Sequence, residues 1–99
     1  MKERQYRESR LCRLLGNPVV YRMAVLLAKE GRLTPSRLAM MTGRSVQTIS
    51  GHLAKLRTAD VVRYETAGGR TQYWLKHPKE VTGLFRALEK AVGAASKLR

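Results

Sequence analysis

Cysteine and acidic side chains are scarce in this 99-residue sequence. The single cysteine, Cys12, excludes a disulfide within the chain, and one cysteine with two histidines is too little for a soft-metal site. Only seven Asp and Glu residues oppose 20 Lys and Arg residues, which gives a net charge of +13. This excess indicates a polyanionic partner, nucleic acid before membrane, with a merely solvated basic surface as the alternative.

Long apolar runs are also missing. The N-terminal stretch MKERQYRESRLCRLLG is charged throughout and has no apolar segment of the kind found in secretory signals. The longest apolar neighbourhood, residues 19–28, is interrupted by Arg22 and is too short to span a bilayer. We therefore expect no membrane association and a cytoplasmic location. Because 43% of the residues are hydrophobic and recur periodically, the charge does not indicate disorder.

Residue patterns that support catalysis are absent from the sequence as well. It contains no paired carboxylates, no glycine loop of the phosphate-binding type and no cysteine–histidine couple at a plausible spacing. The sequence therefore predicts neither an enzyme nor a bound cofactor.

What is present is a clear series of helix start and stop signals. Asn17 and Thr34 each precede a proline, and Ser45 precedes an apolar-periodic stretch, so each is expected to cap a helix. Glycines end these segments. The four predicted helices cover residues 2–15, 18–30, 35–42 and 46–57.

After Asp60 the period changes from helical to alternating. VVRYET (Val61–Thr66) and TQYWL (Thr71–Leu75) flank AGGR, which predicts a two-stranded hairpin with a glycine turn. A last helix is expected over residues 79–97. The predicted fold is mainly α with a small β-hairpin, in the order α-α-α-α-β-β-α. This is a single winged helix-turn-helix domain over 1–99, with the helix-turn-helix at 34–57 and the wing at 61–75.

Three stretches resemble the ArsR/SmtB family of winged-helix repressors: LGNPVVYRMAVLL, LTPSRLAMMTGRSVQTISGHLAKLRTADVV and GGRTQYWL. Together they extend from about Leu14 to Leu75. The resemblance implies a repressor that binds operator DNA as a homodimer through its first and last helices, residues 1–15 and 79–97. The family's usual metal-sensing cysteines, in PSRLAMMTG, and the histidine–carboxylate pairs of its last helix are missing. We therefore expect no metal site.

The fourth predicted helix carries the main candidate site. Val46, Ile49, Leu53 and Leu56 form its apolar stripe, and the opposite face carries Gln47, Gly51 and Lys55, flanked by Thr48 and Ala54. Such a low surface suits close approach to the major groove, with Gln47 and Thr48 at base edges. The alternatives are that Gly51 is an idle substitution and that Gln47 and Thr48 form a solvated helix start.

Other side chains are expected to hold the DNA backbone. The hydroxyls of Ser45 and Ser50 suit phosphate contacts, and Arg70 at the wing tip suits a phosphate or the minor groove; a solvated turn charge is the alternative. Arg44, directly before Ser45, is a further DNA-binding candidate. The resemblance places His52 near the backbone, although a structural histidine is the alternative. Trp74 is expected to pack on a neighbouring helix. Arg4, Arg7, Arg10 and Arg13 wrap around the first helix and are interpreted as solvated charges.

Apolar side chains on the first and last helices exceed what a small core needs, so we expect them to form an obligate two-fold interface. Cys12, between leucines, is expected to pack in the core or the interface, with a redox or metal role as the alternative. The interface candidates are Leu11, Leu14, Leu15, Val81, Leu84, Phe85, Leu88 and Val92.

The sequence thus predicts a transcriptional regulator that binds double-stranded DNA sequence-specifically. The main alternative is a non-regulatory nucleic-acid packaging or RNA-binding winged-helix module, which would use the same basic surface. A protein-interaction winged helix is a third class, and the high positive charge argues against it.

Overall fold

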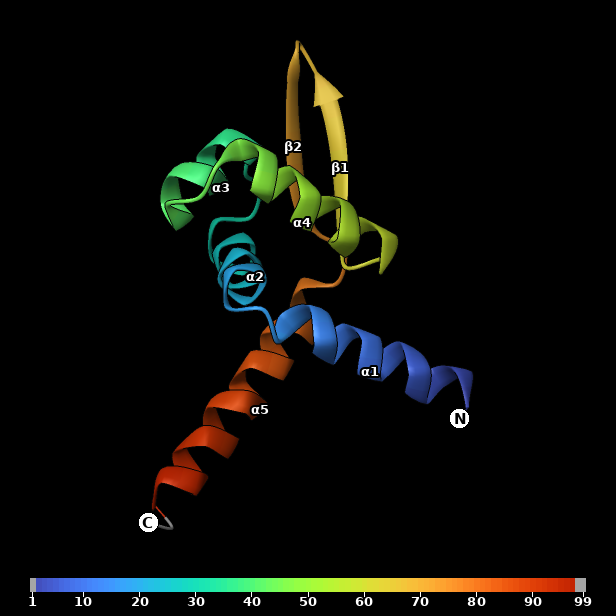
Figure 1. Cartoon of the computed structure of the whole chain (residues 1–99), viewed down its shortest axis with the longest axis vertical. Helices are drawn as coiled ribbons and strands as arrows, with labels where there is room; N and C mark the ends of the chain where they lie inside the picture. Colours follow the sequence, from blue (N-terminus) through green and yellow to red (C-terminus); the bar gives the residue numbers. More distant parts are fainter. Residues whose placement is uncertain (1, 98–99) are drawn as a thin grey trace.

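Five helices and one hairpin make up the chain, and the computed structural model describes residues 2–97 (Figure 1). Their order, α-α-α-α-β-β-α, is the one predicted, and their bounds lie within one or two residues of those expected. The elements are α1 (Glu3–Leu15), α2 (Pro18–Glu30), α3 (Pro35–Thr42), α4 (Val46–Thr58), β1 (Val62–Ala67), β2 (Arg70–Leu75) and α5 (Pro78–Lys97).

Three helices begin with the side-chain caps that the sequence predicts. Asn17 Oδ1 accepts hydrogen bonds from the amides of Val19 and Val20, at 2.9 and 3.2 Å. The hydroxyls of Thr34 and Ser45 each accept from the amide three residues later, both at 3.1 Å. These bonds satisfy amides that have no partner within a helix, so the start of each helix is fixed locally.

The core lies between α2, α3, α4 and the base of the hairpin. Met23, Leu27 and Leu38 are fully buried, as are the α4 residues Ile49, Leu53 and Leu56 and the β1 residue Val62. The predicted stripe of α4 is therefore confirmed at three of its four positions. The expectation for Val46 is wrong: it is 47% exposed, because the first turn of α4 extends past the core.

The hairpin pairs Val62 with Leu75 at its base and Ala67 with Arg70 at its tip. Gly68 and Gly69 form the two-residue turn with φ of 59° and 77°, the left-handed values that favour glycine in such turns. Leu75 is buried in the core, and the half-buried Tyr73 packs against it. Leu33, before α3, bridges to Tyr73 through two backbone hydrogen bonds of 2.8 and 3.0 Å.

Two helices extend away from this core as arms, α1 and α5 (Figure 1). Among their described side chains, α1 has no buried residue, and Phe85 of α5 packs on Tyr21 of α2 with ring centroids 4.9 Å apart. Within residues 2–97 no single helix is long and apolar enough to cross a membrane. Taken together, α1 and α2 have the length and apolar composition of a membrane span, but a bend of 96° separates them.

Candidate nucleic-acid interface

The connection between α3 and α4 is fixed by backbone geometry. Gly43 has φ of 70°, and its amide bonds to the Ala39 carbonyl. The Arg44 amide also donates to the Ala39 carbonyl, at 3.1 Å, and the Thr42 hydroxyl donates to the Leu38 carbonyl at 2.7 Å. These contacts turn the chain sharply after α3 and start α4 at a defined angle. They form a helix-turn-helix in which Arg44 is exposed at the turn.

The outer face of α4 is exposed to solvent, and most of its side chains are short. Figure 1 shows α4 on the near side of the molecule with no other element in front of it. The exposed side chains on this helix include Gln47, Thr48, Ser50, Ala54 and Lys55. All but Lys55 are short or medium in length, and all but Ala54 have a hydrogen-bonding group. The sequence-predicted residues of α4 therefore occur together on one accessible surface.

Gly51 sits at the centre of this surface. A Cβ atom built at Gly51 would meet no atom within 4 Å, and Gly51 is not one of the positive-φ glycines. Neither packing nor backbone conformation within the described chain thus requires glycine here. Because glycine in a helix costs about 1 kcal/mol relative to alanine, the benefit of Gly51 is expected to come from outside the chain.

Ser45 and Thr48 form a local hydrogen-bonded pair. Ser45 Oγ accepts the Thr48 amide at 3.1 Å and donates to Thr48 Oγ1 at 2.9 Å. The Ser45 hydrogen is therefore used within the cap, and Thr48 retains its own hydroxyl hydrogen as a donor. Direct donation from Ser45 to a phosphate would require breaking this bond.

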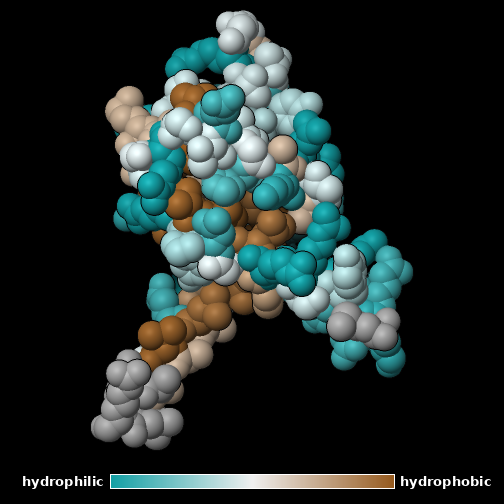
Figure 2. All heavy atoms as spheres, viewed as in Figure 1, coloured by the Kyte–Doolittle hydropathy of each residue, from teal (hydrophilic) through white to brown (hydrophobic). Residues whose placement is uncertain are grey.

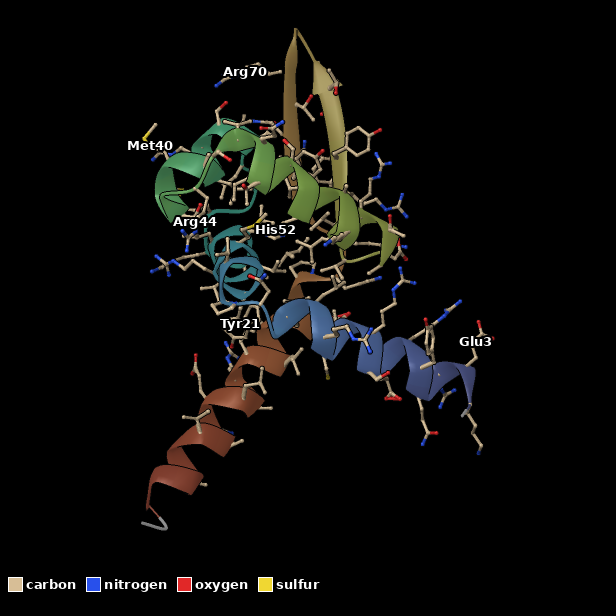
Figure 3. All side chains as sticks on the ribbon, in the orientation of Figure 1. Glu3, Tyr21, Met40, Arg44, His52 and Arg70 are labelled. Carbon is tan, nitrogen blue, oxygen red and sulfur yellow. The ribbon has the colours of Figure 1, made fainter. Side chains whose placement is uncertain are left out.

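His52 is half-buried, unlike the exposed Gly51 before it. Figure 3 shows it on the side of α4 that faces α2 and the end of α1. There it lines a hollow of about 550 Å³ between α1 and α4, together with Lys55. His52 is thus at the edge of the candidate surface.

The wing carries Arg70 at its tip, exposed and directly after the glycine turn. In Figure 3 the Arg70 side chain extends away from the tip, above α3. The ring of Trp74 lies under the guanidinium of Arg32, in the segment between α2 and α3, at 4.0 Å from the ring centroid. Packing of Trp74 on a neighbouring helix stays a prediction. Arg32 also pairs with Glu65 of β1 at 3.2 Å. Sequence reasoning missed this contact, since the partners are distant in the chain.

The dimer candidates fall into three groups by exposure. Leu11, Leu14, Leu15, Val81 and Leu84 are half-buried, whereas Leu88 and Val92 are 38% and 66% exposed. Figure 2 shows hydrophobic side chains gathered along α5. Phe85 is only 7% exposed because it packs on Tyr21 of the same chain, so its ring is already covered within one subunit.

Cys12 is exposed on α1. Packing of Cys12 in the core, one half of the expectation, is therefore wrong, and packing in an interface remains a prediction. Within the described residues, no three His, Cys, Asp or Glu side chains gather closely enough to hold a metal ion.

Asp60 ends α4 in a left-handed conformation, with φ of 64°. Its carboxylate accepts a hydrogen bond from Lys76 Nζ at 2.5 Å. This bond is the main cause that lowers the pKa of Asp60 below its ordinary value of 3.8. The pair links the chain just after α4 to the chain just after β2.

No family model matches the sequence, and no curated protein matches it. Solved structures do match. NolR from Sinorhizobium fredii has a TM-score of 0.81 at 24% identity, with 92% of this chain and 89% of that chain covered. The homodimeric winged helix-turn-helix DNA-binding domain of Mb0332 from Mycobacterium bovis, a possible ArsR-family transcriptional regulator, has a TM-score of 0.80 at 21% identity. That match covers 100% of this chain and 94% of the other.

The transcriptional repressor PagR of Bacillus anthracis has a TM-score of 0.72 at 23% identity, with 85% of this chain and 94% of that chain covered. At such identities the likeness concerns the fold. The predicted winged helix-turn-helix fold is therefore confirmed.

Proposed function

We propose that this chain is a transcriptional regulator of the ArsR/SmtB family, a repressor that binds operator DNA as a homodimer. The observation that carries the proposal is the exposed outer face of α4 with its short side chains. At its centre is Gly51, where neither packing nor backbone conformation within the described chain requires a glycine. A helix that enters the major groove needs such a face. Gln47 would pair with an adenine edge, and Thr48 would donate its free hydroxyl hydrogen to a base or a phosphate.

Backbone contacts would come from around this helix. Arg44 at the turn, Ser50 and Lys55 on α4, and Arg70 on the wing are all exposed, so a phosphate could approach each of them. The net charge of +13 favours a DNA partner through counterion release. Ser45 would act mainly through the cap, which orients the first turn of α4.

A homodimer is supported by the apolar surface of the two arms. Leu88 and Val92 expose hydrophobic side chains on α5, and a hollow of about 750 Å³ between α1 and α5 is lined by Leu11, Leu15 and Leu84 among others. Burial of this surface against a second copy would place two α4 helices on successive turns of one face of the DNA. The solved Mb0332 domain is itself homodimeric.

Selection of bound duplexes from a random pool tests the proposal. We expect enrichment of two related half-sites about one helical turn apart, and binding that survives an excess of random duplex. A packaging or RNA-binding module would instead coat all duplexes alike or prefer RNA, and either result would contradict a sequence-specific regulator.

A further inference from the structure

A second basic surface lies outside the helix-turn-helix and the wing. The hollow of about 550 Å³ between α1 and α4, here called the α1–α4 groove, runs beside the outer face of α4. Helix α1 lies below α4 in the view of Figure 1, whereas α3 lies towards its upper left. The groove is lined by Tyr6, Ser9, Arg10, Arg13, Leu14, Asn17, Val20, His52, Ala54, Lys55 and Thr58.

The charges in the groove all have one sign. Arg10, Arg13 and Lys55 line it, and none of its lining residues is Asp or Glu. The hollow on the other side of α1 differs, because Glu8, Asp60 and Glu80 are among its lining residues. Helix α1 therefore separates a hollow lined by charges of both signs from one whose charged side chains are all positive; both are also partly apolar.

The arginines of α1 differ in their pairing. Arg7 pairs with Glu3 at 3.3 Å, on one exposed turn of the helix. Within residues 2–97, neither Arg10 nor Arg13 forms an ion pair. The charges that line the groove are thus available to a ligand, because no carboxylate among the described residues neutralises them.

The neutral groups of the groove have more limited roles. The hydroxyls of Ser9 and Thr58 donate to backbone carbonyls, at 2.9 and 3.0 Å, and Asn17 caps α2. Tyr6 is 56% exposed, so its phenolic hydroxyl is accessible to a ligand. The groove consequently offers positive charges and a hydroxyl donor beside the apolar side chains of Leu14, Val20 and Ala54, and its charges suit an anionic oxygen ligand rather than a cation.

We propose that the α1–α4 groove holds the sugar-phosphate backbone of one DNA strand beside the major groove that α4 enters. This inference rests on the proposed function and names a contact surface that lies outside the helix-turn-helix and the wing. An α-helix with its side chains is about 10–12 Å wide and the major groove about 12 Å wide. A strand must therefore pass close along each flank of α4, and on the α1 side it meets Arg13, His52 and Lys55.

The test replaces one arginine of the groove and one outside it. Arg13→Gln removes a charge that lines only this groove, and Arg4→Gln removes an equal charge from the same helix but from neither hollow. For each variant, affinity is measured against salt concentration on a selected duplex and on a random duplex. Phosphate ethylation interference on the selected duplex then locates the contacts.

For Arg13→Gln we expect the slope of log affinity against log salt to fall by about 0.9 on both duplexes, with the ratio of their affinities unchanged. Ethylation interference should disappear at one or two phosphates beside the site that α4 reads. Arg4→Gln should leave both readouts as in the wild type. Equal slopes for Arg13→Gln and the wild type, or equal losses in the two variants, would overturn the inference.

The same experiment separates the inference from the function on which it rests. If the wild type prefers the selected duplex but Arg13→Gln changes nothing, the regulator proposal stands and the groove contact is wrong. If the wild type shows no preference while Arg13→Gln still lowers the slope, the groove binds backbone and sequence-specific regulation is wrong. Unchanged thermal melting and sedimentation of Arg13→Gln provide the control for fold and assembly.

Discussion

The Ser45 hydroxyl forms two hydrogen bonds with Thr48: it accepts from the Thr48 amide at 3.1 Å and donates to the Thr48 hydroxyl oxygen at 2.9 Å. One side chain thus starts α4 and also directs the Thr48 hydroxyl. Because the Ser45 hydrogen is used in this bond, Thr48 is the better donor towards a ligand. The start of the helix and the start of the candidate site are therefore the same structure.

This pair gives the first prediction, which uses Ser45→Asp and Ser45→Asn. Both replacements keep an N-cap acceptor, so the free energy of unfolding should stay within about 0.5 kcal/mol of the wild type. Only Asp adds a negative charge beside the DNA, so it should weaken binding to all duplexes while Asn should not. Chemical denaturation and binding isotherms measure the two effects. Equal binding by the two variants would mean that phosphates do not approach this end of α4.

The second prediction separates base recognition from backbone binding. Gln47→Ala should cost about 1–3 kcal/mol on the selected duplex and little on random DNA, because a base contact carries sequence information. Arg70→Ala should weaken both duplexes alike and lower the salt slope by about one unit. Binding isotherms over a range of salt concentrations measure both. The assignment is wrong if Gln47→Ala loses affinity equally on every sequence.

The third prediction concerns assembly. Sedimentation should show a dimer at micromolar concentration, and Leu88→Glu with Val92→Glu should convert it to a folded monomer, since both side chains are exposed on α5. The matched control is Ala87→Glu with Ala94→Glu, two exposed positions on the other side of the same helix. That control should remain a dimer. A wild-type monomer at micromolar concentration would refute the proposed interface.

The fourth prediction concerns Asp60 and pH. Asn tolerates the left-handed backbone of residue 60, so Asp60→Asn removes mainly the negative charge that strengthens the bond from Lys76. Since that bond lowers the pKa of Asp60 in the folded state, it stabilises the fold above the ordinary value of 3.8. Its contribution disappears as the pH falls through the lower folded pKa. Thermal melts should show a higher melting temperature for the wild type than for Asp60→Asn at pH 7, and equal melting temperatures at a pH below the folded pKa of Asp60. A constant difference would contradict this account.

Local signals explain how much of the fold could be predicted from the sequence. Asn17, Thr34 and Ser45 act on amides two or three residues away, so their caps are readable in the chain. The glycines at 43, 68 and 69 have positive φ, and these positions mark the turns.

Contacts between distant residues explain what the sequence did not predict. The stripe of α4 predicts a buried Val46 by periodicity, but periodicity does not show where the core ends. The place of Trp74 under Arg32 and the bridge between Leu33 and Tyr73 depend on how the hairpin docks.

The candidate site follows the same rule. The residues of α4 could be predicted because one helix face brings them together, as could Arg70 at a glycine turn. The α1–α4 groove could not, because Arg10 and Arg13 belong to a series that wraps around α1. Only the position of α1 beside α4 determines which members of that series line the hollow next to the candidate surface.

Binding by Gly51→Leu tests the central claim, that the outer face of α4 enters the major groove. A Cβ atom at residue 51 would have no atom within 4 Å, and Leu has a higher helix propensity than Gly, so the variant should be about 0.5–1 kcal/mol more stable than the wild type. Gly51→Ala, the control, gains similar stability but adds only a methyl group.

Thermal melts measure the stability of each variant, and binding isotherms on the selected duplex measure its specific affinity. We predict that Gly51→Leu is well folded and loses specific binding, while Gly51→Ala keeps most of it. Wild-type specific affinity in a well-folded Gly51→Leu protein would show that this face stays outside the groove.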